Sequence, residues 1–139
     1  MKKQRLALFL AALLLGLSLV VLAGSFLGGA FADSGAASYQ KITQEQAKEM
    51  MDTQTVLVLD VREQSEYDGG HIPGAVLLPV GQIDQETAAA LIPAKDAVVL
   101  VYCRSGNRSK TAAQALAQLG YTAVYEFGGI NSWPYAVER

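Results

Sequence analysis

Cysteine is nearly absent from this chain: Cys103 is the only one among 139 residues. A single cysteine cannot form a disulfide within the chain, so no internal disulfide framework can stabilise the fold. Histidine is equally scarce, because His71 stands alone. No set of cysteine, histidine and carboxylate residues has the spacing of metal ligands. The sequence therefore predicts no structural disulfide and no metal site.

Basic residues are also few, with 11 lysines and arginines against 13 acidic residues. Three of the basic residues (Lys2, Lys3 and Arg5) precede an apolar run at the N-terminus. The rest of the chain keeps 8 basic and 13 acidic residues. An acidic domain is a poor nucleic-acid binder. We therefore expect no nucleic-acid partner, and any anion site must be local rather than a general basic face.

The N-terminal segment has the pattern of an export signal. The positive start is followed by an apolar run from Leu6 to Ala23, and Ala30-Phe31-Ala32 is an A-x-A cleavage pattern before Asp33. The apolar run is longer than usual for a signal and could span a bilayer as one helix. An uncleaved membrane anchor is therefore an alternative. No Leu-x-x-Cys stretch lies near the cleavage pattern, which argues against a lipid anchor.

This pattern divides the chain into three parts. Residues 1–32 are predicted to be a signal peptide, or a membrane anchor through residues 6–27, and residues 33–38 a short linker. Residues 39–139 have the length of one domain of ordinary size. Because the positive end stays inside, both alternatives place the domain outside the cytoplasm, in a periplasm, at the cell surface or secreted.

Short apolar runs alternate with helical patterns along the domain. This alternation predicts an α/β fold with a single, mostly parallel central sheet flanked by helices on both faces. Capping signals support two of the helices, a capping box at Thr43 and Gln46 and an N-cap at Asp84. The predicted strands are 56–60, 75–78, 97–102 and 122–125, and the predicted helices are 43–51, 64–68, 84–91, 109–119 and 130–137.

The cysteine directly follows the strongest apolar run, residues 97–102. Ligands of parallel sheets bind at the carboxyl ends of the strands. The loop after Cys103 leads into a helix, whose first turn has unpaired N–H groups and a partial positive charge. Gly106 permits the loop to curl, and Arg104 and Arg108 add positive charge. These features predict a lowered pKa for Cys103 and a nucleophile inside an anion site; the alternative is a small, inert buried side chain.

The size of the loop favours one chemistry. Tyrosine-phosphatase-like enzymes place an arginine six positions after the cysteine, whereas Arg108 comes five positions after Cys103. A shorter ring leaves room for a sulfur atom and less for a tetrahedral phosphate. Tyr102 also stands where those phosphatases have histidine. Sulfur transfer is therefore favoured over phosphate hydrolysis or arsenate reduction.

Three motifs, in the correct order, resemble those of the single-domain rhodaneses, a family of sulfurtransferases. The first signature is Asp60-Val61-Arg62-Glu63, followed by Glu66-Tyr67 and by the segment from Gly70 to Ala75. The second is the active-site loop from Cys103 to Ser109, and the third is Gly128-Gly129 with Trp133. The resemblance extends over about residues 38–139. A cysteine and an arginine at this spacing, without the other two motifs, would indicate the family far less specifically.

The resemblance implies a persulfide cycle. The thiolate of Cys103 would attack a small anionic sulfur donor such as thiosulfate, release sulfite, and pass the bound sulfur to cyanide or a thiol. The cycle needs no metal and no organic cofactor. The oligomeric state is left open, and nothing in the sequence demands more than a monomer. The two loop arginines favour thiosulfate over 3-mercaptopyruvate. The implied substrate-binding residues are Arg104, Ser105, Gly106, Asn107, Arg108 and Ser109.

Two further residues are expected to support the site. Asp60 and Arg62 end a strand on the same side as Cys103, and we expect an internal ion pair that orders the edge of the cleft. Arg62 is the better placed of the two to reach the site. His71 is expected to fix the connector 70–75 rather than to act as a base.

The sequence leaves other functions open. The domain could instead be a persulfide carrier, or a sulfur-relay binding module for a partner protein, which would use the same cysteine. Cys103 argues against a non-catalytic interaction module, since such family members often lack the cysteine. A thiol–disulfide oxidoreductase is disfavoured because no second cysteine is present to resolve a mixed disulfide. No single residue of the sequence identifies the physiological sulfur donor or the physiological sulfur acceptor.

Overall fold

A computed structural model describes residues 36–139 of the chain. The predicted signal peptide or anchor, residues 1–32, and the first half of the predicted linker lie outside the described residues. Within residues 36–139, no helix has the length and apolar character needed to cross a membrane.

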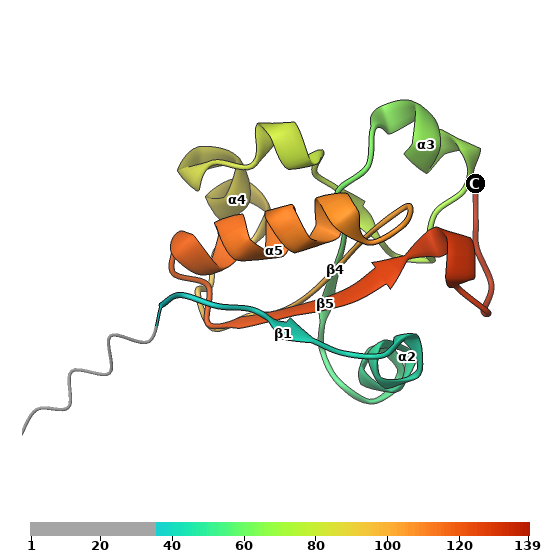
Figure 1. The fold of residues 1–139 in the computed structure, drawn as a ribbon, viewed down its shortest axis with the longest axis horizontal. Coiled ribbons are helices and arrows are strands. Elements are labelled where there is room, and N and C mark those ends of the chain that lie inside the picture. Colours follow the sequence, from blue (N-terminus) through green and yellow to red (C-terminus); the bar gives the residue numbers. More distant parts are fainter. Residues whose placement is uncertain (1–35) are drawn as a thin grey trace, which may run out of the picture. The chain divides into compact units, whose positions relative to one another are not determined.

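The core of the domain is a five-stranded sheet in which every pair of neighbouring strands is parallel (Figure 1). The strand order is β1-β5-β4-β2-β3, which places β4 at the centre. The strands are β1 (Gln40–Lys41), β2 (Leu57–Asp60), β3 (Val76–Leu77), β4 (Val98–Cys103) and β5 (Ala123–Gly129). The helices are α2 (Gln44–Thr53), α3 (Gln64–Gly69), α4 (Gln85–Leu91) and α5 (Asn107–Gln118), with 3₁₀ turns η1 (Val80–Gln82) and η2 (Ile130–Ser132).

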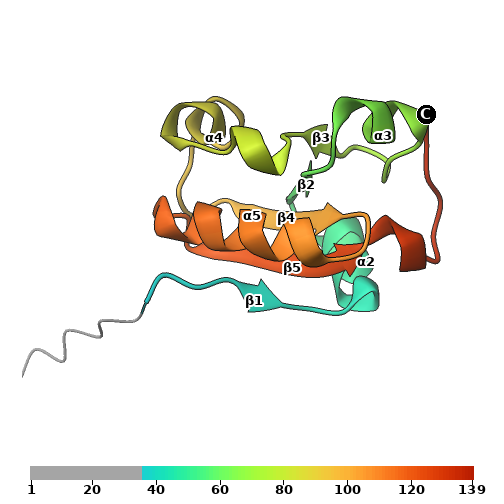
Figure 2. The ribbon, with the colours of Figure 1, turned by 45° about the horizontal axis from the view of Figure 1, so that its top comes forward.

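Helices cover both faces of the sheet (Figure 2). Helices α4 and α5 pack on the face that carries Val99, Val101 and Cys103. Helix α2 packs on the opposite face, against Leu100 and Tyr102. Because successive side chains of a strand point to opposite faces, β4 is buried on both sides and its sequence is an unbroken apolar run. The predicted α/β architecture is therefore confirmed.

Local sequence signals explain most helix boundaries. The Thr43 hydroxyl accepts a hydrogen bond from the backbone of Gln46 to cap α2, and Asp84 caps α4 in the same way. Helix α5 begins at Asn107, slightly before the predicted start, because Gly106 adopts a left-handed conformation with φ 102° and turns the chain directly into the helix.

The secondary structure differs from the prediction at three places. The short strand β1 was missed, because Gln40 and Lys41 are polar and exposed and carry no strand pattern. Strand β5 continues to Gly129, where a turn was predicted. The predicted C-terminal helix 130–137 is only the 3₁₀ turn η2, because Pro134 lacks an N–H group and disfavours helical geometry at the residue before it.

Candidate active site

Cys103 is the last residue of the central strand, at the carboxyl edge of the sheet. Its side chain is free and only 1% exposed. The following loop curls back, so that the backbone N–H of Gly106 donates to Cys103 Sγ at 3.1 Å. The thiol also lies 3.4 Å from the Ser109 hydroxyl in the first turn of α5. The fold thus places the sulfur where a strand end and a helix N-terminus meet.

The surroundings of Cys103 favour its ionised form. Burial raises the pKa of the thiol, but hydrogen bonds outweigh this and lower the pKa below its ordinary value. The bonds come from the side chain and backbone of Ser109 and from the backbone N–H groups of Gly106 and Ser105. This direction agrees with the prediction, and the main cause of the lowered pKa is the ring of donors rather than the charges of the two arginines.

The loop rests directly on the end of β5. A Cβ atom at Gly129 would lie 2.0 Å from the carbonyl oxygen of Arg104 and 2.6 Å from the backbone nitrogen of Ser105, so only glycine fits there. The same Arg104 carbonyl accepts a hydrogen bond from the Asn131 backbone at 3.1 Å. The Gly128-Gly129 motif therefore supports the cysteine loop by close backbone packing.

The two loop arginines have different surroundings. Arg108 donates two hydrogen bonds to the carboxylate of Glu66 on α3, at 2.7 and 2.9 Å. Arg104 is exposed and forms no ion pair within residues 36–139. Of the two arginines expected to attract an anionic donor, only Arg104 keeps an unpaired charge, whereas Arg108 ties the loop to α3. Ser105 and Asn107 are exposed on the same loop.

Replacing Glu66 by glutamine is expected to destabilise the domain by about 1 kcal/mol at neutral pH, since the pair is about one-third exposed and partly screened. The Arg108 hydrogen bonds are the main cause that lowers the pKa of Glu66 from 4.5 to about 2. Because the pKa of Glu66 is lower in the folded than in the unfolded protein, the pair stabilises the fold at pH values above the unfolded-state pKa. This contribution is lost as the pH falls toward 2. The urea unfolding midpoints of the wild type and of Glu66→Gln should therefore differ at pH 7 and converge in acid.

A matched control for that experiment is Glu49→Gln, on the exposed face of α2. Glu49 forms no ion pair within residues 36–139, so this variant should follow the wild type at every pH. An equal loss of stability in both variants, or a Glu66→Gln deficit that persists in acid, would contradict the assigned role of the pair.

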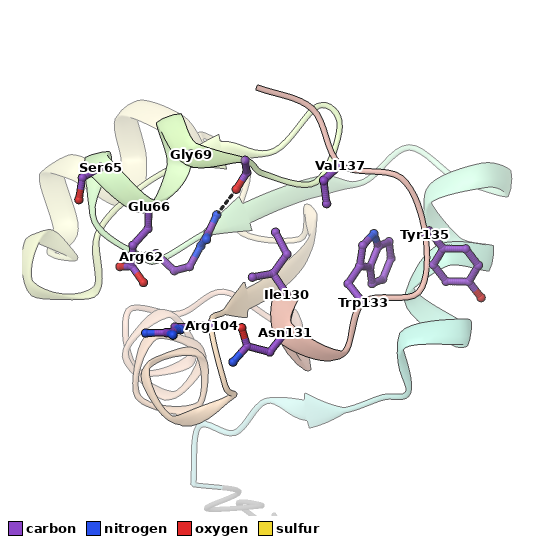
Figure 3. A pocket seen from close by; sticks show the side chains of 11 residues that line it. Arg62, Ser65, Glu66, Gly69, Arg104, Ile130, Asn131, Trp133, Tyr135 and Val137 are labelled. Carbon is purple, nitrogen blue, oxygen red and sulfur yellow. Dashed lines mark hydrogen bonds between the residues drawn. The ribbon is translucent and has the colours of Figure 1, made fainter.

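An open cleft of about 500 Å³ lies beside the loop. Figure 3 shows its polar part, with Arg62, Glu66 and Arg104, and its apolar part, with Trp133 and Tyr135. Cys103 itself does not line this cleft; its chain neighbour Arg104 does. A substrate could therefore be held next to the loop by one unpaired cation and by aromatic surface.

The expected ion pair between Asp60 and Arg62 is present and buried. Asp60 is fully buried, and its carboxylate accepts hydrogen bonds from Arg62 at 2.7–3.1 Å and from the Tyr102 hydroxyl at 2.7 Å. Arg62 also donates to the Gly70 carbonyl at 2.8 Å and lines the cleft (Figure 3). The pair thus fixes one wall of the cleft, and Arg62 is the member that reaches it.

His71 has a structural environment. Its ring stacks on Tyr67 at 3.7 Å between centroids, and Nδ1 lies 3.0 Å from the Tyr67 carbonyl. Its backbone bridges to Glu138 near the C-terminus. These contacts agree with the expected role in fixing the 70–75 connector.

Sequence reasoning missed Glu126, a fully buried carboxylate on β5 behind the cysteine loop. It accepts a hydrogen bond from the Ser109 hydroxyl at 2.7 Å. The available signal was an acidic residue directly after the predicted strand 122–125, between two aromatic residues.

With this fold and loop, the chain is one of the α/β proteins that hold a buried cysteine among backbone N–H groups at the end of the central strand. Comparison with known proteins places the chain within that class. Residues 43–135 match the rhodanese-like domain. The chain belongs to the rhodanese family.

Similar proteins of known name are sulfur-handling proteins. The chain is 36% identical over 73 residues to the thiosulfate sulfurtransferase PspE of Escherichia coli, covering 52% of this chain and 69% of that protein. It is 32% identical over 96 residues to the thiosulfate sulfurtransferase GlpE of Coxiella burnetii, covering 68% and 87%. It is 33% identical over 108 residues to the putative sulfur carrier protein YrkF of Bacillus subtilis, covering 76% of this chain and only 57% of that protein.

Solved structures agree with this family assignment. A structure described as rhodanese with anions from E. coli superposes with a TM-score of 0.57 at 30% identity, covering 61% of this chain and 99% of that one. The rhodanese-like domain of the Anabaena protein Alr3790 superposes with a TM-score of 0.65 at 25% identity, covering 70% and 77%. Family membership and these relatives support sulfur transfer in general.

Proposed function

We propose that this protein is a thiosulfate sulfurtransferase that moves sulfane sulfur through a persulfide on Cys103. The observation that carries the proposal is the ring of donors around Sγ, led by the Gly106 N–H at 3.1 Å. Hydrogen bonds to an anion favour its formation, so the same ring suits both the attacking thiolate and the terminal sulfur of a persulfide.

Each loop residue has a role in this cycle. The backbone N–H groups from Arg104 to Ser109 bind the anionic sulfur, and the side chain of Arg104 attracts the anionic donor. Arg108 holds the loop against α3 through Glu66. The cycle has two half-reactions: thiosulfate gives its outer sulfur to Cys103 and sulfite leaves, and then cyanide or a thiol removes that sulfur. Ping-pong kinetics follow from this order.

A second candidate function is that of a persulfide carrier for a partner protein. The name of the Bacillus subtilis relative, a putative sulfur carrier, favours it. Both functions use the same persulfide and differ in the acceptor. Slow turnover with small acceptors, combined with fast transfer to a partner, would favour the carrier.

The test is intact-mass spectrometry of the purified domain beginning at Asp33 after incubation with thiosulfate. The expected result is a gain of one sulfur atom, which cyanide then removes as thiocyanate. A folded domain with a free thiol and no gain in mass would reject thiosulfate as the donor. It would shift the proposal to another sulfur donor or to the carrier function.

We also propose that the domain works outside the cytoplasm as a monomer. The positive start, the apolar run and the Ala30-Phe31-Ala32 pattern support export. Expression of the full chain in a bacterium, followed by fractionation and mass measurement, should give a soluble exported product beginning at Asp33. A full-length product in the membrane fraction would indicate the anchor, and a full-length cytoplasmic product would contradict export.

A further inference from the structure

Glu126 is a buried acidic residue that has no role in the persulfide cycle described above. It is fully buried on β5. Its Oε1 accepts two hydrogen bonds of 2.7 Å, from the Ser109 hydroxyl and from the Gly128 backbone. Its Oε2 is buried and has no hydrogen-bond partner within residues 36–139. Buried polar atoms nearly always have a partner, so this carboxylate is incompletely stabilised as an anion.

The hydrogen bonds form a chain that runs from the cysteine to this acid. The Cys103 thiol donates to Ser109 Oγ at 3.4 Å, and Ser109 Oγ donates to Glu126 Oε1 at 2.7 Å. A hydroxyl has one hydrogen, so Ser109 can donate either to the carboxylate or to the sulfur, but not to both. When Cys103 becomes an anion and takes the Ser109 hydrogen, Glu126 loses one of its two donors.

Within residues 36–139, no ion pair offsets negative charge on Glu126. Lys41 is the neighbour of Glu126 across the β1–β5 pairing and is exposed. On α5, Arg108 is bound to Glu66, and Lys110 is exposed. No ion pair joins any of these residues to Glu126 in the described part of the chain. Two anions, a thiolate and a carboxylate, would then share one hydroxyl donor, which is unfavourable in a buried site.

We propose, resting on the sulfur-transfer function above, that Glu126 receives the proton of the Cys103 thiol through the Ser109 hydroxyl. The thiol proton moves to Ser109 Oγ while the hydrogen of Ser109 moves to Glu126. The Cys103 thiolate then bonds to the outer sulfur of thiosulfate, and the S–S bond of thiosulfate breaks. Its electron pair leaves with sulfite, and the persulfide anion remains beside a neutral Glu126.

The second half-reaction reverses the proton path. Cyanide bonds to the terminal sulfur and leaves as thiocyanate, and the electron pair of the persulfide bond returns to Cys103 as thiolate. The proton then passes from Glu126 through Ser109 back to the sulfur. Glu126 acts through Ser109 and does not touch the substrate, so it is a positioning residue that holds one proton during the cycle.

The test is infrared difference spectroscopy between the thiol and persulfide forms of the same protein. The persulfide is made with thiosulfate or, if thiosulfate does not react, with inorganic polysulfide, and intact mass confirms it. The wild type should gain the carbonyl band of a protonated carboxylic acid, which shifts in D₂O. Glu126→Gln keeps an oxygen that can accept from Ser109 and Gly128, but it should lack the band and form persulfide about 10-fold more slowly or worse.

Ser109→Ala keeps Glu126 but removes the bridging hydroxyl, so it should also lose the band; this variant serves if Glu126→Gln does not fold. Glu49→Gln, on the exposed face of α2, should retain the band. The proposal is overturned if the wild-type persulfide shows no band, if the band persists in either site variant, or if neither reagent makes a persulfide. A wild type that reacts only with polysulfide but gains the band would reject thiosulfate and retain the role of Glu126.

Discussion

The Cys103→Ser variant is expected to take up no sulfur from thiosulfate and to produce no thiocyanate above background, a loss of roughly 10⁴-fold or more. Serine has nearly the same shape, but its hydroxyl does not ionise near neutral pH, whereas the donor ring lowers the pKa of the thiol. Because Cys103 is the only cysteine, no second thiol can accept sulfur in its place. Intact mass and thiocyanate colorimetry measure the two half-reactions separately.

This variant should remain folded. The serine hydroxyl can accept from the Gly106 N–H and donate to Ser109, so no buried donor of the loop is left without a partner. We expect its stability to lie within about 1 kcal/mol of the wild type in urea unfolding. A folded Cys103→Ser protein that still gains sulfur or turns over thiosulfate would show that the nucleophile lies elsewhere.

The Asp60→Ala variant is expected to lose about 3–5 kcal/mol of unfolding free energy, because it leaves the buried guanidinium of Arg62 without its counter-ion. Arg62 is only 5% exposed, and Tyr102, whose hydroxyl also donates to Asp60, is fully buried. A loss of that size is a large part of the stability of a small domain. Urea unfolding at neutral pH, followed by circular dichroism, measures it.

The double variant Asp60→Leu with Arg62→Met separates charge from packing. It removes both members of the ion pair and replaces them with apolar side chains of similar volume. It should therefore recover much of the unfolding free energy that Asp60→Ala loses. Asp68→Ala, on the exposed surface of α3, should stay close to the wild type. An Asp60→Ala protein as stable as the wild type would mean that the pair does not hold this wall of the cleft.

Much of the fold could be predicted because its signals are local. The apolar run before Cys103 identified the central strand, and Thr43 and Asp84 marked helix starts that the structure contains. Strand β1 carried no such signal, since its pairing with β5 is a property of the assembled sheet. The predicted C-terminal helix does not form, because Pro134 interrupts the segment after the 3₁₀ turn η2.

The cysteine loop could be predicted from the sequence alone, because Cys103, Gly106 and Ser109 lie within seven consecutive residues that one strand end and one helix start bring together. The surroundings of that loop, in contrast, depend on tertiary contacts. Arg108 meets Glu66 across 42 positions of sequence, and Ser109 meets Glu126 across 17. Backbone conformation and capping depend on neighbouring residues, so they can be read locally. The pairing of polar side chains far apart in the chain depends on how the helices pack on the sheet, because that packing brings the groups together and removes water from them.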